Sequence, residues 1–239
     1  MMNHSTVFGV DYYRNIYYRY VSEDNYLTDE NIFLQTREFI VLFCSQPLSK
    51  IHLLLLPRLS FLNVKNCREL SPQNLTKVRR LHSAAYIIVD HLVRFFVSSN
   101  SQLHEEKSCE QLLAKLSETN YKMDNLLSSQ RIKIGYHARP TFEPLHLHIL
   151  TDDFDSIWLK TRRQWNSFNT ACFLESTSIE EWLESGYTIS ELLPENMNEL
   201  ENHLMQPIRC SHCRKVLKDI RSLKTHLKTL HQNDSDPVL

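Results

Sequence analysis

Leu145-His146-Leu147-His148-Ile149-Leu150 is the stretch that decides the fold. Apolar and imidazole side chains alternate along it, which predicts a β-strand with Leu147 on one face and His146 and His148 on the other. On such a strand the two imidazoles lie about 7 Å apart. At that spacing one imidazole can attack a phosphate while the other orients it or donates a hydrogen bond to its oxyanion. Without its surroundings, the same pair also fits a solvated strand face or a metal site.

Other segments supply a sheet and a helix for this strand. Residues 39–43 and 51–56 predict a hairpin-like pair of strands, and residues 132–137 predict a further strand that ends at His137. Ser71-Pro72 opens a long helix, with serine as N-cap and proline at the first helical position, that runs to about Phe96. Strands before and after a long helix predict an α+β fold.

The composition narrows the class of protein. The chain has 239 residues, which is enough for one sizeable core plus a small module. Its formal net charge is -1. No apolar run approaches the roughly 18–20 residues of a membrane span, and no secretory signal is expected. Only two of the six cysteines, Cys210 and Cys213, stand close together, which favours a reducing compartment with one metal site over a disulfide framework. Three glycines in the whole chain exclude a glycine-rich phosphate-binding loop.

Charge divides the chain into three regions. Residues 1–173 are predicted to form the main domain, with the polar segment 98–130 as a surface insertion. From residue 164 to residue 208 there are eight glutamates and no lysine or arginine. We therefore expect residues 174–206 to be an acidic linker. Residues 207–239 form the third region, a small module with a short tail.

The third region carries a metal-binding motif. Cys210-Ser-His-Cys213 is followed by twelve residues, His226, four more residues and His231. This C-x2-C-x12-H-x4-H spacing lets a β-hairpin and a helix share one tetrahedral Zn²⁺. A module of about 25 residues cannot bury enough surface by itself, so the zinc is expected to be structural.

The same module is basic. From Arg209 to His231 there are seven lysines and arginines against one aspartate, which predicts a polyanionic partner. One finger reads only about 3 bp. Its cations are therefore expected to hold phosphates without reading bases. A purely structural or protein-binding finger is the alternative.

The histidine motif and its surroundings resemble a known family. Gly135-Tyr136-His137-Ala138-Arg139-Pro140 followed by the 145–150 strand is similar to the active-site region of the aprataxin family, within the histidine triad superfamily. Asp153-Phe154-Asp155-Ser156 and Trp165-Asn166-Ser167-Phe168-Asn169-Thr170 are similar to the stretch that follows, and the finger comes in the expected order. The resemblance runs from about residue 39 to 231, is weakest across 98–130, and is closest to the short architecture of fungal members. It implies an antiparallel sheet with packed helices, followed by a ββα finger.

The resemblance implies an activity, the removal of AMP from 5′-adenylated DNA. His146 would be the nucleophile that attacks the AMP phosphorus and forms a covalent histidine–AMP intermediate, which water then hydrolyses. His148 would orient or stabilise the phosphoryl group, and His137 would donate a proton to the leaving phosphate. His52 matches the histidine that lines the same pocket. An imidazole is a credible nucleophile near neutral pH because much of it is unprotonated there.

Cations complete the substrate site that the resemblance implies. Lys160, Arg162 and Arg163 fall where basic residues of the family meet the DNA backbone, although a solvated charge run explains each of them nearly as well. Leu48 stands where the family often has a lysine, which leaves Lys50 as the nearest cation.

Two more departures lie in the predicted site, Pro144 bearing on the chemistry and Cys44 on nucleotide affinity. Pro144 occupies the position of the triad's first histidine, which fungal members of the family often lack too. Activity is therefore still expected, with activation of the nucleophile relying on other groups. Cys44 replaces the aspartate that usually binds the ribose hydroxyls. At the N-terminus five tyrosines are expected either to pack in the core or to stack on DNA bases: Tyr12, Tyr13, Tyr17, Tyr18 and Tyr20.

The sequence therefore predicts a monomeric nuclear DNA-repair hydrolase with DNA as partner, AMP as product and no membrane contact. Two alternatives remain open at this stage. One is a histidine triad hydrolase of small adenine nucleotides, which would need neither finger nor basic module. The other is an inactive protein that binds DNA or RNA ends, which the changes at Pro144, Cys44 and Leu48 would suit.

Overall fold

The computed structural model describes residues 17–22, 27–98 and 132–230. Three predicted features fall outside these ranges: nearly all of the surface insertion at 98–130, Tyr12 with Tyr13, and the fourth predicted metal ligand His231. Within the described ranges, no helix is both long enough and apolar enough to cross a membrane.

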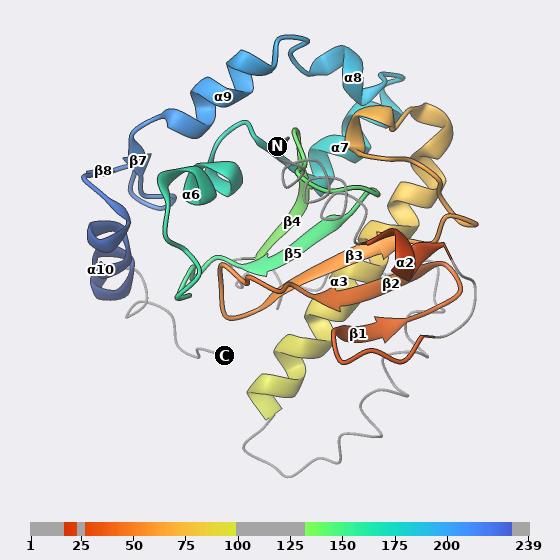
Figure 1. The fold of residues 1–239 in the computed structure, drawn as a ribbon, viewed down its shortest axis with the longest axis horizontal. Helices are drawn as coiled ribbons and strands as arrows, with labels where there is room; N and C mark the ends of the chain where they lie inside the picture. The colour runs from red at the N-terminus through yellow and green to blue at the C-terminus, as the bar shows by residue number, and fades with distance from the viewer. Residues whose placement is uncertain (1–16, 23–26, 99–131, 231–239) are drawn as a thin grey trace, which may run out of the picture.

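A six-stranded sheet in the order β1-β2-β3-β5-β4-β6 forms the centre of the described protein (Figure 1). Every neighbouring pair is antiparallel. The strands are β1 Ile32–Gln35, β2 Phe39–Phe43, β3 His52–Pro57, β4 Ile132–His137, β5 Leu147–Thr151 and β6 Phe173–Glu175. The predicted strands are confirmed within one or two residues, whereas the short edge strands β1 and β6 were not predicted.

The helices and the second sheet complete the fold. They are α2 Tyr18–Val21, the 3-10 turns η1 Cys67–Glu69 and η2 Pro72–Asn74, α3 Leu75–Ser98, α6 Arg162–Asn169, α7 Ser176–Glu184, α8 Ile189–Leu192, α9 Met197–Met205, the hairpin of β7 Ile208–Arg209 and β8 Val216–Leu217, and α10 Ile220–Leu230. The predicted α+β class, with an antiparallel sheet and packed helices, is confirmed.

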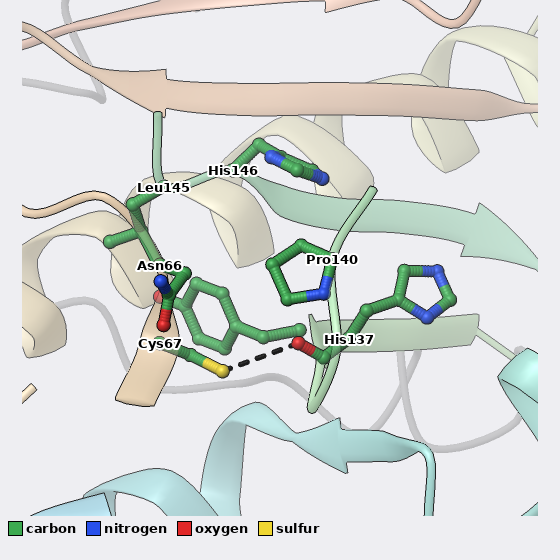
Figure 2. Close-up of a pocket in the computed structure, with 7 residues that line it drawn as sticks. Asn66, Cys67, His137, Pro140, Leu145 and His146 are labelled. Atoms are coloured by element: carbon green, nitrogen blue, oxygen red, sulfur yellow. Dashed lines mark hydrogen bonds between the residues drawn. The ribbon is translucent and has the colours of Figure 1, made fainter. Parts of the chain in front are cut away.

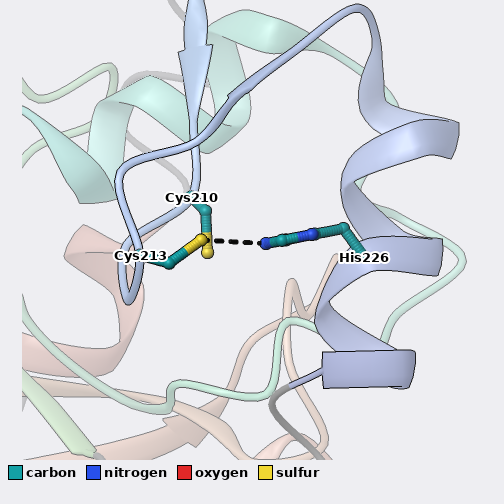
Figure 3. Close-up of side chains that lie close together, drawn as sticks. All are labelled: Cys210, Cys213 and His226. Atoms are coloured by element: carbon teal, nitrogen blue, oxygen red, sulfur yellow. Dashed lines mark hydrogen bonds between the residues drawn. The ribbon is translucent and has the colours of Figure 1, made fainter.

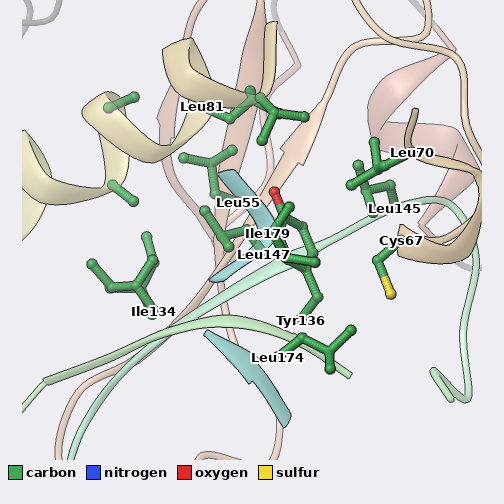
Figure 4. Close-up of a cluster of buried hydrophobic side chains, with 14 of the residues drawn as sticks. Leu55, Cys67, Leu70, Leu81, Ile134, Tyr136, Leu145, Leu147, Leu174 and Ile179 are labelled. Carbon is green, nitrogen blue, oxygen red and sulfur yellow. The ribbon is translucent and has the colours of Figure 1, made fainter. Parts of the chain in front are cut away.

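One face of the sheet packs against α3, and together they make the main core (Figure 4). Alternate residues of the strands point to this face, including Leu55, Leu147 and Ile149, and all three are at most 1% exposed. The helix begins as the sequence predicts, because the main-chain N–H of Ser71 donates to Asn74 Oδ1 at 2.9 Å and Pro72 follows it.

The opposite face is divided among three neighbours. At one end α2 covers the sheet with the buried ring of Tyr20. At the other end α6 and the β7–β8–α10 module cover it, with Trp165 fully buried between them. The stretch of sheet between these two covers carries the histidines described below.

The prediction that residues 174–206 form a linker is wrong. These residues form α7, α8 and α9, which arc from the α3 side of the sheet toward the β7–β8 hairpin (Figure 1). Their apolar side chains recur at helical spacing and are buried in the main core: Ile179, Leu183, Ile189, Leu193, Leu200 and Leu204. The glutamates occupy the other sides of the helices. Each helix is therefore amphipathic, which the average charge of the segment does not indicate.

Candidate active site and metal cluster

The register of three neighbouring strands brings four histidines to one face of the sheet. His148 on β5 stands opposite Leu54 on β3 and Gly135 on β4. Residues paired across strands point to the same face, and so do residues two apart along a strand. The four histidines that meet in this way are His52, His137, His146 and His148.

His148 lies at the centre of the histidine cluster. Its ring centroid is 4.5 Å from that of His137, 5.1 Å from that of His146 and 5.4 Å from that of His52. The His52, His146 and His148 side chains are buried. The sequence-based prediction that His146 and His148 share a face, and that His137 and His52 lie beside them, therefore agrees with their placement.

Phe168 on α6 forms an aromatic wall for this cluster. Its ring centroid is 4.5 Å from His137, 5.2 Å from His148 and 5.6 Å from His52, with the rings close to perpendicular. The sequence marked Phe168 only as part of a family-like stretch. A local signal did exist: the capping box of Thr161 and Gln164 starts a helix there, and Trp165 and Phe168 lie three apart on its buried side.

Pro144 fixes the proton of the His146 ring. Nδ1 of His146 lies 2.9 Å from the main-chain oxygen of Pro144. A carbonyl oxygen only accepts hydrogen bonds, so Nδ1 carries the proton and Nε2 of the neutral ring keeps its lone pair. The residue that departs from the family pattern thus still orients the ring, because the interaction uses the main chain.

Burial keeps the cluster uncharged at neutral pH. Desolvation, and then the nearby His146, lower the pKa of His52 to about 4. Desolvation followed by His146 and His52 lowers the pKa of His137 to about 3, and burial lowers the pKa of His148 well below its ordinary value. Burial also lowers the pKa of His146. The site therefore presents neutral imidazoles, the form that attacks phosphorus or donates one hydrogen bond.

A small, partly open pocket lies beside His137 and His146 (Figure 2). It is lined by Asn66, Cys67, Tyr136, His137, Pro140, Leu145 and His146. The Cys67 thiol donates to the main-chain oxygen of His137 at 3.3 Å, and burial raises the pKa of that thiol to about 12. Cys67 is therefore a neutral thiol that holds the end of β4.

The described N-terminal tyrosines have three different surroundings. Tyr20 is 4% exposed and packs in the core, as one alternative predicted. Tyr17 is half-buried, with its ring 6.1 Å from that of His146 and 5.7 Å from that of Phe142. Tyr18 donates to Glu143 Oε2 at 3.3 Å.

Leu48 and Cys44, two positions that depart from the family pattern, and the nearby Lys50 lie in three different environments. Leu48 is buried, and its main-chain N–H donates to His52 Nδ1 at 3.1 Å. Cys44 is half-buried beside the core cluster that contains Tyr20. Lys50 is exposed, and its main-chain N–H donates to Asp153 Oδ1 at 3.1 Å.

The predicted DNA-binding cations on α6 and before it already have partners. The ammonium of Lys160 lies 5.1 Å from the centre of the Trp158 ring. Arg163 makes a two-pronged ion pair with Glu201 on α9, with Nη2 2.8 Å from Oε2. Glu201 also lies 3.5 Å from Arg139. One carboxylate of the acidic segment, that of Glu201, thus pairs with two arginines of the region where DNA was predicted to bind.

The described part of the finger forms one group able to hold a metal ion (Figure 3). Ligand atoms of Cys210, Cys213 and His226 all lie within 4.8 Å of one another. The Cys213 Sγ is 3.2 Å from His226 Nε2. Cys210 and Cys213 come from the β7–β8 hairpin and His226 from α10, as the ligand spacing predicts.

The finger packs directly against the domain that carries the histidines. The Trp165 indole donates to the main-chain oxygen of Arg209 at 3.0 Å, next to the first metal ligand. The Lys224 ammonium donates to the Ser156 main-chain oxygen at 2.6 Å. One hydrophobic cluster joins Phe168, at the histidines, to Cys210.

These features define a class of protein. A His-x-His strand on an antiparallel sheet, with two further histidines from its neighbouring strands, is the arrangement of the histidine triad fold. The chain belongs to the family described as "Scavenger mRNA decapping enzyme C-term binding", which matches residues 14–164.

Individual relatives are aprataxins, as the sequence resemblance predicted. The chain is 40% identical to the aprataxin of Gallus gallus over 101 residues, which are 42% of this chain and 30% of that protein. It is 26% identical over 165 residues to an aprataxin-like protein of Saccharomyces cerevisiae, 65% of this chain and 69% of that protein. The solved structure of the aprataxin ortholog Hnt3 from Schizosaccharomyces pombe is 22% identical, covers 84% of each chain and has a TM-score of 0.49. The chain spans less than a third of the first curated relatives that it matches.

Proposed function

We propose that this protein is a DNA-repair deadenylase, a nucleotide hydrolase that removes AMP from 5′-adenylated DNA through a covalent histidine–AMP intermediate. The observation that carries the proposal is the His146 ring, buried and neutral, whose Nδ1 is held 2.9 Å from the Pro144 oxygen so that Nε2 keeps its lone pair. The similarity to aprataxins supports the choice of adenylated DNA over a small nucleotide.

The first chemical step is attack of His146 Nε2 on the AMP phosphorus. The N–P bond forms as the P–O bond to the DNA 5′-phosphate breaks, and the DNA leaves. The attacking ring then carries positive charge, which the Pro144 carbonyl oxygen stabilises through the Nδ1–H hydrogen bond.

Neighbouring histidines assist both steps. The bound phosphate charge raises the pKa of the nearby His137, so this ring can take up a proton and give it to the departing DNA phosphate. His148, 5.1 Å from His146 between ring centroids, is placed to donate to a phosphoryl oxygen. In the second step water attacks phosphorus and gives a proton to the His137 ring, the N–P bond breaks and AMP leaves.

The finger is proposed to hold one structural Zn²⁺. The donor set of Cys210, Cys213 and His226 suits zinc, because thiolates and imidazole are its usual ligands. His231 is the fourth ligand that the spacing supplies. Zinc would supply fold stability only, since the reaction uses the histidines of the sheet.

DNA is the proposed partner, and the nucleus is the proposed location of a monomeric protein. Lys50, Lys160 and Arg163 would contact the DNA backbone together with the cations of the finger. Arg163 must exchange Glu201 for a phosphate when it does so.

The test compares 5′-adenylated nicked DNA with adenosine phosphoramidate as substrates. We expect AMP release from the adenylated DNA and a labelled protein–AMP adduct after quenching in alkaline detergent, because the N–P bond of the adduct is stable to base and labile to acid. His146→Ala should lower the rate by a factor on the order of 10³ or more and abolish the adduct. His203→Ala, a histidine on α9 outside the histidine cluster, should keep both.

Two other outcomes would replace the proposal. Turnover of the phosphoramidate alone would make the protein a small-nucleotide hydrolase. Binding of nicked DNA without AMP release, by wild type and His146→Ala alike, would make it an inactive DNA-end-binding protein.

A further inference from the structure

A chain of two hydrogen bonds leads from the main chain to the central histidine. The Leu48 N–H donates to His52 Nδ1 at 3.1 Å. His52 Nε2 lies 3.0 Å from His148 Nδ1. Both rings are buried, so water does not compete for these contacts.

The direction of this chain is set at its first bond. A main-chain N–H can only donate, so His52 Nδ1 must accept and carries no proton. A neutral imidazole has one N–H, which in His52 is therefore on Nε2. That N–H donates to His148 Nδ1, and the remaining proton of His148 is consequently on Nε2.

The reverse arrangement is excluded by the same geometry. If the proton of His148 were on Nδ1, His52 would have to accept it at Nε2 and carry its own proton on Nδ1. The Nδ1–H would then face the Leu48 N–H, two donors with no acceptor between them. The Leu48 side chain is buried in the cluster that also contains Phe168, which keeps the amide in place.

The outer end of the chain is an unused donor. His148 Nε2 is buried and has no hydrogen-bond partner within the described residues. A buried donor without a partner is costly and needs an explanation. This one belongs to the ring next to His146, where an anionic oxygen of a bound phosphoryl group would satisfy it.

We propose that His52 is a positioning residue, which acts through His148 by fixing its Nε2–H tautomer so that this donor is ready for a phosphoryl oxygen. The inference rests on the proposed function for its chemical purpose. The tautomer itself is a property of the resting protein and can be measured without any turnover.

The first measurement is the tautomer of His148, read from ¹⁵N–¹H correlation spectra of the imidazoles. We expect the Nε2–H form in the wild type, with signals assigned by their loss in His148→Gln. In His52→Phe, which keeps a ring but removes both hydrogen bonds, the two tautomers should mix. A wild-type His148 with its proton on Nδ1, or an unchanged tautomer in His52→Phe, would overturn the proposal.

The second measurement separates positioning from binding and from folding. On adenylated DNA, His52→Phe should lower kcat roughly 10- to 100-fold with a smaller change in KM, because the lost donor acts mainly on developing charge. His52→Gln can still place an amide N–H near His148 Nδ1, so it should recover part of kcat. Equal losses in the two variants, or a loss in KM alone, would contradict the proposal.

The outcomes distinguish this inference from the proposed function. If the wild type releases no AMP but shows the Nε2–H tautomer that His52→Phe disturbs, the proposed function fails and the positioning role stands. If the wild type releases AMP while the tautomer does not depend on His52, the positioning role fails alone. Thermal melting of each variant identifies a loss that comes from unfolding.

Discussion

Two histidine-containing clusters in the described part of the chain, that of the sheet and that of the finger, differ in what their ring nitrogens meet. In the sheet cluster, nitrogens meet other imidazoles or main-chain groups, as His52 meets the Leu48 N–H and His146 meets the Pro144 oxygen. In the finger, the His226 nitrogen meets two thiols, and all three ligand atoms lie within 4.8 Å of one another. The first arrangement fixes protons on particular atoms, whereas the second points lone pairs at one centre. Histidine chemistry is thus set by the partner of each nitrogen more than by the number of rings.

Removal of the proposed structural metal should have the largest effect and should separate the two clusters. We expect chelation, or Cys213→Ala, to unfold residues 208–230, because the metal closes a core too small to stand alone. Hydrogen exchange should then rise throughout the finger while β3, β4 and β5 stay protected. Cys44→Ala, a cysteine outside the finger, should keep one metal ion per chain. Full protection of residues 208–230 after chelation would show that packing alone holds the finger.

Gly135→Ala should disturb the histidine cluster without touching an imidazole. A Cβ at this position would stand 2.2 Å from the Leu174 main-chain oxygen and 2.8 Å from the Phe173 ring, so β4 and β6 would have to separate. We expect a loss of about 1–3 kcal/mol in the free energy of unfolding, measured in urea. Turnover should fall too, because His137 ends β4, and metal content should not change.

Gly186→Ala is the matched control for that substitution. Gly186 has φ 90°, so alanine is strained there, but nothing lies within 4 Å of its Cβ position. It should lower stability and leave turnover unchanged. If Gly135→Ala also spared turnover, the spacing of β4 and β6 would not matter to the site.

The pH dependence of stability should show a smaller effect that belongs to the histidine cluster. The folded protein keeps the pKa of His52 at about 4, whereas the unfolded chain titrates near the ordinary value of 6.5. Between those values only the unfolded state binds the proton, so stability is full above pH 6.5 and falls as pH falls toward 4. Each such histidine contributes a slope of up to about 1.4 kcal/mol per pH unit.

Urea unfolding between pH 7.5 and 5 measures this slope. Burial raises the pKa of Glu180, but the hydrogen bond to His82 and the charge of Arg79 together outweigh it and lower that pKa below its ordinary 4.5. Its contribution therefore appears below this window. His52→Phe should give a shallower slope than the wild type, and equal slopes would mean that His52 is already protonated in the fold.

Much of the fold followed from local patterns in the sequence. The continuous apolar runs of β2 and β3 and the Ser71-Pro72 start of α3 are decided by nearby residues, and the structure confirms them. The strand β6 has three residues, and its place depends on the missing Cβ of Gly135, which no local pattern records. The prediction of a linker at 174–206 was wrong because it rested on the average charge of the segment. The helical spacing of its leucines and isoleucines is the pattern that indicates three packed helices.

For the candidate site, sequence placed the histidines but not the groups that act on them. The alternation around His146 and His148 put them on one face, and family resemblance added His137 and His52. The amide of Leu48 and the carbonyl of Pro144 were overlooked because a main-chain group carries no sequence letter of its own. The sequence pattern draws attention to Leu48 only because it replaces a lysine and to Pro144 only because it replaces a histidine.

The pairing of Arg163 with Glu201 has a consequence for the ions that would accompany the proposed DNA binding. A free arginine that meets a phosphate displaces a condensed cation from the DNA, and each such contact steepens the fall of affinity with salt. In the absence of DNA, Arg163 and Arg139 share the Glu201 carboxylate. If they contact DNA phosphates instead, that carboxylate loses its partners and must bind a cation from solution. If the proposed DNA binding holds, its salt dependence should therefore count fewer contacts than the basic side chains of the sequence suggest.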